Sequence, residues 1–123
     1  MFIGYQNEKI VLTANTKQEL LNTPCIAFTN IAETNEPVEM IDCEYYLGEN
    51  AINTARAKRI RNIRDEYLRK YVDPIVSNNL RWAELSGEKR NQYESYRRYL
   101  LDITSDINFP NINVLTFDEF NKQ

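Results

Sequence analysis

Few side chains in this sequence could carry covalent chemistry. The two cysteines, Cys25 and Cys43, show no Cys-x-x-Cys spacing, and the chain contains no histidine. Histidine is the commonest general base and the commonest metal ligand, so its absence removes the centre of most hydrolase mechanisms and most zinc sites. We therefore expect no catalytic residues and no bound metal.

The remaining routes to catalysis are also weak. Cys25 is followed by Ile26, Ala27 and Phe28, a pattern typical of a buried strand, so we interpret it as a structural cysteine. The three glycines are isolated positions and form no phosphate-binding loop, and the carboxylates are scattered as turn residues or as partners of basic residues. The sequence predicts that the protein is not an enzyme and needs no cofactor.

Charge divides the chain near residue 50. Residues 1–50 carry eight acidic residues and two lysines, whereas the remainder has a net charge of plus three. We expect a small β-rich lobe over residues 1–49 and a helical lobe over 50–123 that ends in a short extended tail. No window approaches the roughly 18 apolar residues of a membrane span, and the first residues lack a signal-peptide pattern. We expect no membrane association and a cytoplasmic location.

The first half has the pattern of short strands separated by turns. Residues 2–6 and 9–14 flank Asn7-Glu8, and residues 25–32 and 38–47 flank 33–37, so both pairs are predicted to be hairpins. Between them, Thr16 and Glu19 have the spacing of a capping box, which predicts a short helix from Lys17 to Leu21.

The second half changes to a helical period. Its first helix is predicted over residues 50–72, with an apolar stripe that ends at Tyr67 and Tyr71. Asp73-Pro74 is predicted to open a second helix, and Ser86 a third that continues to about Ile103. The inner side of this third helix should contain Tyr93, Tyr96, Leu100 and Ile103. The expected fold class is α+β, with a small antiparallel β region before a three-helix module whose first helix is long.

Several basic residues of the helices have an acidic residue four positions away. Such pairs occur at Arg61, Asp65 and Arg69, at Glu66 and Lys70, and along Arg90, Glu94, Arg98 and Asp102. They are usually a solvated helix face. Arg64 and Arg97 instead lie beside the predicted aromatic stripe, where an arginine can hold helices together or anchor a partner. Either role is compatible with the sequence.

Aromatic residues leave the same two alternatives open. The chain contains eight tyrosines, and Tyr67, Tyr71, Tyr93 and Tyr96 occupy inner helical positions. A tyrosine ring suits a core whose hydroxyls reach its edge, and it equally suits a binding surface. Trp82 is the only tryptophan, and we expect it to pack where the helices meet.

Three motifs of the helical half resemble phage tail fibre assembly chaperones. They are Arg61–Leu68, Arg81–Leu85 and Tyr93–Ile103, followed by Phe109-Pro110. This family has an Arg-Asp-x-x-Leu helix, then a Tyr-Arg-x-x-Leu-x-Asp helix and a proline-containing exit. The resemblance covers residues 56–112. The family's Trp-Pro ending is replaced here by residues 113–120.

This resemblance implies a function in virus assembly. Such a protein binds the tip of a trimeric tail fibre and assists its folding or trimerisation in the host cytoplasm, and some members remain on the virion. A chaperone of this kind acts through binding energy alone. The candidate partner-binding residues are Arg64, Tyr67, Trp82, Tyr96, Arg97 and Phe109.

Two alternatives remain open from the sequence. A nucleic-acid-binding module could use the basic run Arg56, Lys58, Arg59, Arg61 and Arg64, although a pI near 5.0 is unlike the basic footprint of such domains. A permanent structural component of a virion would differ from a chaperone in residence time more than in surface chemistry.

Overall fold

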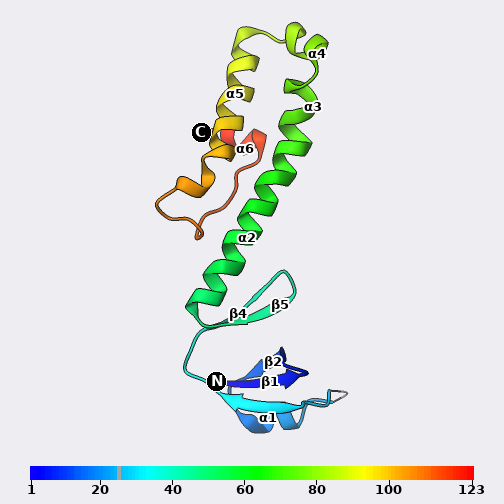
Figure 1. Cartoon of the computed structure of the whole chain (residues 1–123), viewed down its shortest axis with the longest axis vertical. Helices are drawn as coiled ribbons and strands as arrows, with labels where there is room; N and C mark the ends of the chain where they lie inside the picture. The colour runs from blue at the N-terminus through cyan, green and yellow to red at the C-terminus, as the bar shows by residue number, and fades with distance from the viewer. Residues whose placement is uncertain (25) are drawn as a thin grey trace. The chain divides into compact units, whose positions relative to one another are not determined.

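The computed structural model describes residues 1–24 and 26–123, and the chain divides into two compact units, residues 1–55 and 56–123 (Figure 1). Antiparallel strands precede the helices along the chain, so the α+β class is confirmed. The boundary between the units falls inside helix α2 (Glu49–Tyr67). The helical unit contains the candidate site and the first unit the two sheets.

The first unit contains a three-stranded antiparallel sheet in the order β2-β1-β3. Strands β1 (Phe2–Gln6) and β2 (Lys9–Ala14) form the predicted hairpin. Its turn residues Asn7 and Glu8 have φ angles of 50° and 72°, the left-handed conformation of a two-residue turn that matches the twist of the strands. The first hairpin prediction is confirmed.

Helix α1 (Lys17–Leu21) begins at the predicted Thr16 cap, but the reciprocal bond of the predicted capping box goes to Asn15 rather than to Thr16. The Thr16 hydroxyl accepts a hydrogen bond from the Glu19 amide, at 3.3 Å, while the Glu19 carboxylate accepts from the Asn15 amide, at 3.3 Å. Two backbone donors at the start of the helix are thereby satisfied. Leu20 of this helix and Ile3 of β1 are both buried.

The second predicted hairpin is wrong in its pairing. Strand β3 (Asn30–Glu33) pairs with β1 rather than with the segment that follows it. Residues 38–47 instead form a hairpin of their own, from β4 (Val38–Ile41) and β5 (Glu44–Leu47). Asp42 and Cys43 have φ angles of 50° and 67°, so this stretch contains a tight turn that we had predicted as continuous strand.

The buried strand predicted from residue 25 is shorter than expected, because β3 begins only at Asn30. Cys25, for which we predicted a structural role in that strand, lies outside the described residues.

Helix α2 continues without a break into η1 (Leu68–Val72), a π-helical turn, and α3 (Asp73–Val76), which makes a helical segment of 28 residues. The predicted helix start at Asp73-Pro74 is therefore wrong. Pro74 cannot donate a hydrogen bond to the carbonyl four residues earlier, and the wide π turn, in which the Asp73 amide donates to the Leu68 carbonyl, accommodates it. A proline that normally ends a helix is thus kept inside one.

The π turn also changes which side chain faces inward. The regular spacing predicted Tyr71 on the inner side, whereas Val72 is fully buried and Tyr71 only half-buried. One additional residue in the turn shifts the following side chains by about 100°, the rotation of one helical position. Val72 therefore takes the central place that the sequence pattern gave to Tyr71.

Three further helices and a short 3-10 turn complete the second unit. They are α4 (Asn79–Glu84), α5 (Gly87–Leu101), η2 (Ile103–Ser105) and α6 (Phe117–Asn121). Ser86 caps α5 as predicted, because its hydroxyl accepts from the Lys89 amide at 3.2 Å. The prediction of an extended C-terminal tail is wrong, because the chain forms helix α6 near its end. Thr116 and Glu119 form a complete capping box at the start of this helix.

The core of the second unit is aromatic. Val72, Tyr96 and Leu100 are fully buried, and half-buried rings from η1, α5 and α6 pack around them. Phe117 stacks on Tyr93 with centroids 4.5 Å apart, and Phe120 stacks on Tyr99 at 5.1 Å. The segment Asn113–Asn121, which we call the C-terminal strap, is held against α5 by these contacts.

Across residues 1–24 and 26–123, no helix combines the length and the apolar character needed to cross a bilayer.

Candidate functional site

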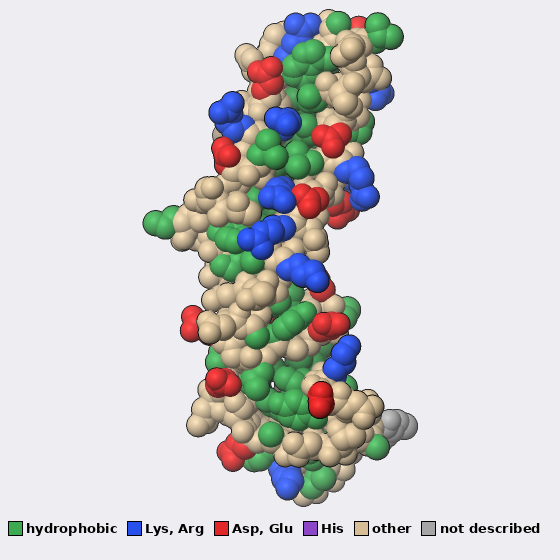
Figure 2. Space-filling model, in the orientation of Figure 1, with side chains coloured by type: hydrophobic (Ala, Val, Ile, Leu, Met, Phe, Trp, Pro, Cys, Tyr) green, Lys and Arg blue, Asp and Glu red, His purple; other side chains and the backbone are tan. Residues whose placement is uncertain are grey.

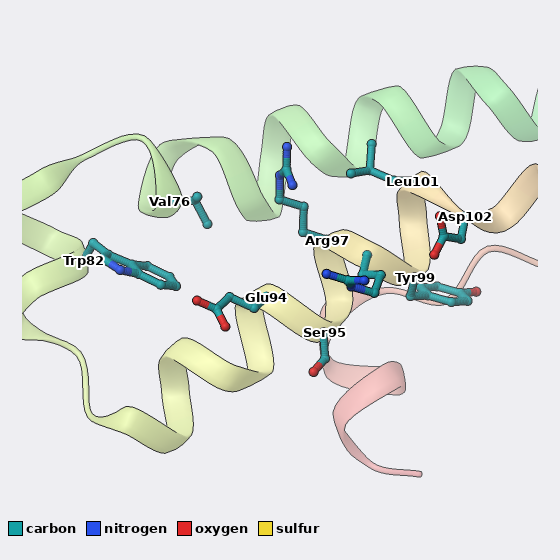
Figure 3. Close-up of a pocket in the computed structure, with 9 residues that line it drawn as sticks. Val76, Trp82, Glu94, Ser95, Arg97, Tyr99, Leu101 and Asp102 are labelled. Atoms are coloured by element: carbon teal, nitrogen blue, oxygen red, sulfur yellow. The ribbon is translucent and has the colours of Figure 1, made fainter.

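An open groove of about 1010 Å³ lies in the helical unit, beside α5 (Figure 3). Val76 of α3 and Trp82 of α4 approach it from one side. Side chains of α5, from Glu94 to Leu101, and the adjacent Asp102 line the other. The groove therefore combines an indole ring and aliphatic groups with charges of both signs. Its complete lining is Val76, Trp82, Glu94, Ser95, Arg97, Arg98, Tyr99, Leu101 and Asp102.

Helix α4, which carries Trp82, is fixed at both ends by side chains. At its start, the Asn78 side-chain oxygen accepts from the Arg81 amide at 3.1 Å. At its end, the Arg90 guanidinium donates to the carbonyls of Trp82, at 3.0 Å, and Ala83, at 2.8 Å. The Trp82 carbonyl also accepts from the Leu85 amide, at 3.3 Å, and Arg90 adds a C-terminal cap that is supplied by α5. Trp82 is thereby held in place as a half-buried wall of the groove.

The exposed side of α5 differs from the solvated ladder that we predicted. Arg90 bonds to carbonyls of α4 rather than to Glu94. On α2, Asp65 pairs with its neighbour Arg64 at 3.0 Å instead of with a residue four positions away. Glu94, Arg97 and Arg98 are exposed, and Leu101 keeps 44% of its surface accessible. This side of α5 presents charges together with apolar area.

Tyr96 and Tyr67, two of the predicted partner-binding residues, belong to the core of the unit. Tyr96 is fully buried, and its hydroxyl donates to the Leu115 carbonyl at 2.7 Å. Burial raises the pKa of Tyr96 above its ordinary value. Tyr67 packs edge-on against Tyr71, with ring centroids 5.4 Å apart. Of the two roles that the sequence left open for these tyrosines, both rings therefore have the structural role in the core.

Of the other four predicted residues, the structure brings two together. Trp82 and Arg97 line the same groove. Arg64 is half-buried beside Asp65, and Phe109 lies under the guanidinium of Arg61, 5.5 Å from the ring centroid. Neither Arg64 nor Phe109 lines the groove.

Several residues of the groove and its support were missed by sequence reasoning. Leu101 and Tyr99 were not singled out, although both lie in the Tyr-Arg-x-x-Leu-x-Asp motif or next to it. The strap was predicted to be extended, yet Thr116 and Glu119 repeat the Thr-x-x-Glu spacing recognised at Thr16. That repeated spacing was the available signal for α6.

The basic run at the start of the helical unit is largely engaged within the chain. Arg56 donates to the Asn111 side chain, Arg61 lies over Phe109, and Arg64 pairs with Asp65. Figure 2 shows basic and acidic side chains interspersed over the helices on the face in view, rather than gathered into one basic patch. Nucleic-acid interfaces are typically more uniformly positive than this surface.

Among residues 1–24 and 26–123, no group of three or more cysteine, aspartate or glutamate side chains is placed to hold a metal ion. The groove itself offers an indole, aliphatic area, carboxylates and guanidinium groups. These groups suit noncovalent binding of another macromolecule.

Searches against protein-family models, curated proteins and solved structures each found no match to this chain.

Proposed function

We propose that this protein is a phage tail fibre assembly chaperone that binds the fibre protein through the groove beside α5. The observation that carries the proposal is the pairing of a half-buried Trp82 with an exposed Arg97 in one open groove. Tryptophan and arginine are the residue types most enriched at the energetic centres of protein interfaces. The motifs that resemble the family, Arg81–Leu85 and Tyr93–Ile103, supply much of this groove.

The proposed mechanism uses binding energy alone. The chaperone covers apolar and strand-edge surface at the tip of the fibre until three fibre chains have assembled, and it stabilises that intermediate by mass action. The encounter takes place in the host cytoplasm. A chain that stays on the finished virion would use the same surface with a slower dissociation rate.

Co-expression with the fibre gene tests the proposal. We expect the wild-type chain to raise the yield of soluble fibre trimer, and Arg97→Ala to lower that yield while the free energy of unfolding changes by less than about 0.5 kcal/mol. Arg69→Ala is the matched control, because Arg69 is also an exposed helical arginine but lies outside the groove.

A yield of trimer that is the same with and without the wild-type chain would contradict the chaperone proposal. If Arg97→Ala instead lowers the melting temperature by several degrees, Arg97 stabilises the fold, and the experiment does not identify the groove as the contact surface.

A further inference from the structure

Two charged residues lie on the side of α5 that faces away from the core. Tyr96 and Leu100 define the inner side, since both are fully buried. Glu94 and Arg98 flank Tyr96 by two residues on each side, which places them about 160° from it around the helix. Both are exposed and both line the groove.

These two charges are available for a partner. Glu94 and Arg98 are one helical turn apart and could pair with each other, but neither side chain forms an ion pair or hydrogen bond with any of the described residues. Leu101, on the same side one turn later, leaves 44% of its surface accessible. The outer side of α5 thus carries a negative charge, a positive charge and an exposed aliphatic group in that order.

This order is complementary to itself when the helix is reversed. If two copies of α5 lie antiparallel about a two-fold axis at the level of Tyr96, Glu94 of each copy faces Arg98 of the other. The same axis places Asn91 of one copy opposite Leu101 of the other. A two-fold contact requires a surface of this self-complementary kind. A parallel arrangement would place like charges opposite each other.

We propose that a second copy of this chain docks in the groove, with the two α5 helices antiparallel and two equivalent Glu94–Arg98 pairs across the axis. Helix α5 has 15 residues and is about 22 Å long, so the seam is short. Stable interfaces bury about 800 Å² on each partner, and much of this seam is polar. The dimer is therefore weak, and salt weakens it further.

This inference goes beyond the proposed function and does not depend on it. Self-association concerns the chain alone, whereas chaperone activity requires the fibre. If both hold, the second copy and the fibre compete for Trp82 and Arg97, and the dimer keeps the groove covered until the fibre is present. Measurements on the chain alone therefore test the dimer, and the co-expression experiment tests the chaperone.

Charge exchange at the two positions provides the test. Sedimentation equilibrium of the purified full chain should show a monomer–dimer equilibrium that shifts toward monomer as salt increases. Glu94→Arg places four arginines around the axis and Arg98→Glu places four glutamates there, so each variant should dimerise at least about tenfold more weakly. The double variant restores the alternation and should regain the wild-type dimerisation constant.

Mixing the two single variants gives a sharper readout. Arginines of the Glu94→Arg chain would face glutamates of the Arg98→Glu chain, so a heterodimer should form where neither variant dimerises alone. Fluorescence of Trp82, the only tryptophan, reports locally on coverage of the groove. Glu66→Arg is the control for Glu94→Arg, because it makes the same change of net charge at an exposed position of α2.

Circular dichroism first establishes that each variant is folded, and the mixing experiment remains informative for mildly destabilised chains. A wild-type chain that stays monomeric at high concentration and low salt would overturn the inference. The inference would also be overturned if both single variants dimerised as strongly as the wild type. It would equally be overturned if a mixture of the two variants formed no heterodimer.

Discussion

The two sides of helix α5 differ in burial and in residue type. The inner side is aromatic and closed: Tyr96 is fully buried, and the rings of Phe117 and Phe120 lie within 5.4 Å of it, centroid to centroid. The outer side is open and mixes Arg97 and Arg98 with Glu94 and Leu101. Tyrosine serves the fold where its hydroxyl finds a carbonyl, and arginine remains available for binding where it finds no internal acceptor.

The largest expected effect comes from emptying the inner side. Tyr96→Ala removes a fully buried ring and leaves a cavity, which should lower the free energy of unfolding by about 3–5 kcal/mol. Urea denaturation followed by circular dichroism measures this change. A loss below about 1 kcal/mol would mean that the aromatic side does not stabilise the unit, and the contrast between the two sides would fail.

Arg90→Ala should have the next largest effect, because Arg90 is the arginine of α5 that does find internal acceptors. Loss of its hydrogen bonds to the Trp82 and Ala83 carbonyls should cost about 1–2 kcal/mol. Arg98→Ala, at an exposed position of the same helix, is the matched control and should change stability little. Equal losses for the two variants, again from urea denaturation, would erase the distinction between structural and available arginines.

The Tyr96 hydroxyl should contribute about 1 kcal/mol through its hydrogen bond to the Leu115 carbonyl. Because burial raises the pKa of Tyr96 in the folded state, its contribution is present below the ordinary pKa of 10.0 and is lost as the pH rises above that value. Tyr96→Phe should therefore lower stability at pH 7 and reduce the decline at alkaline pH. An unchanged alkaline decline would assign that titration to other groups.

The smallest expected effect lies in the strap. Hydrogen bonds from Thr116 lower the pKa of Glu119 below its ordinary value of 4.5. The stabilisation is present above that value and is lost as the pH falls through the lowered pKa of the folded state. Glu119→Gln should flatten this part of the acid unfolding profile, with little change at pH 7. The near-ultraviolet circular dichroism of the stacked Tyr93 and Phe117 rings follows the strap.

The inner side of α5 was predictable because periodicity reports burial directly. Tyr96, Leu100 and Ile103 are buried as their spacing indicated, and Ser86 caps the helix as its residue type indicated. The first hairpin and the Thr16 cap of α1 were also predictable, from their turn and cap residues. In each case the signal lies within a few residues of the feature.

The remaining features depend on contacts between distant segments. Arg90 is spaced to pair with Glu94, but it donates instead to the carbonyls of Trp82 and Ala83 at the end of α4. The pairing of β3 with β1 leaves residues 38–47 to form a hairpin around a turn that contains no glycine. The groove is of this kind as well, since Trp82 and Arg97 line it from two different helices, α4 and α5.

The π turn η1 can also be considered as a change of chain length inside a helix. It holds one residue more than an α turn needs, and that residue decides whether Tyr71 or Val72 faces the core. A related chain with one residue fewer between positions 68 and 72 would keep an unbroken helix but would present a different side chain to α5. A one-residue gap at this point in an alignment would therefore mark a rebuilt core rather than a shortened loop.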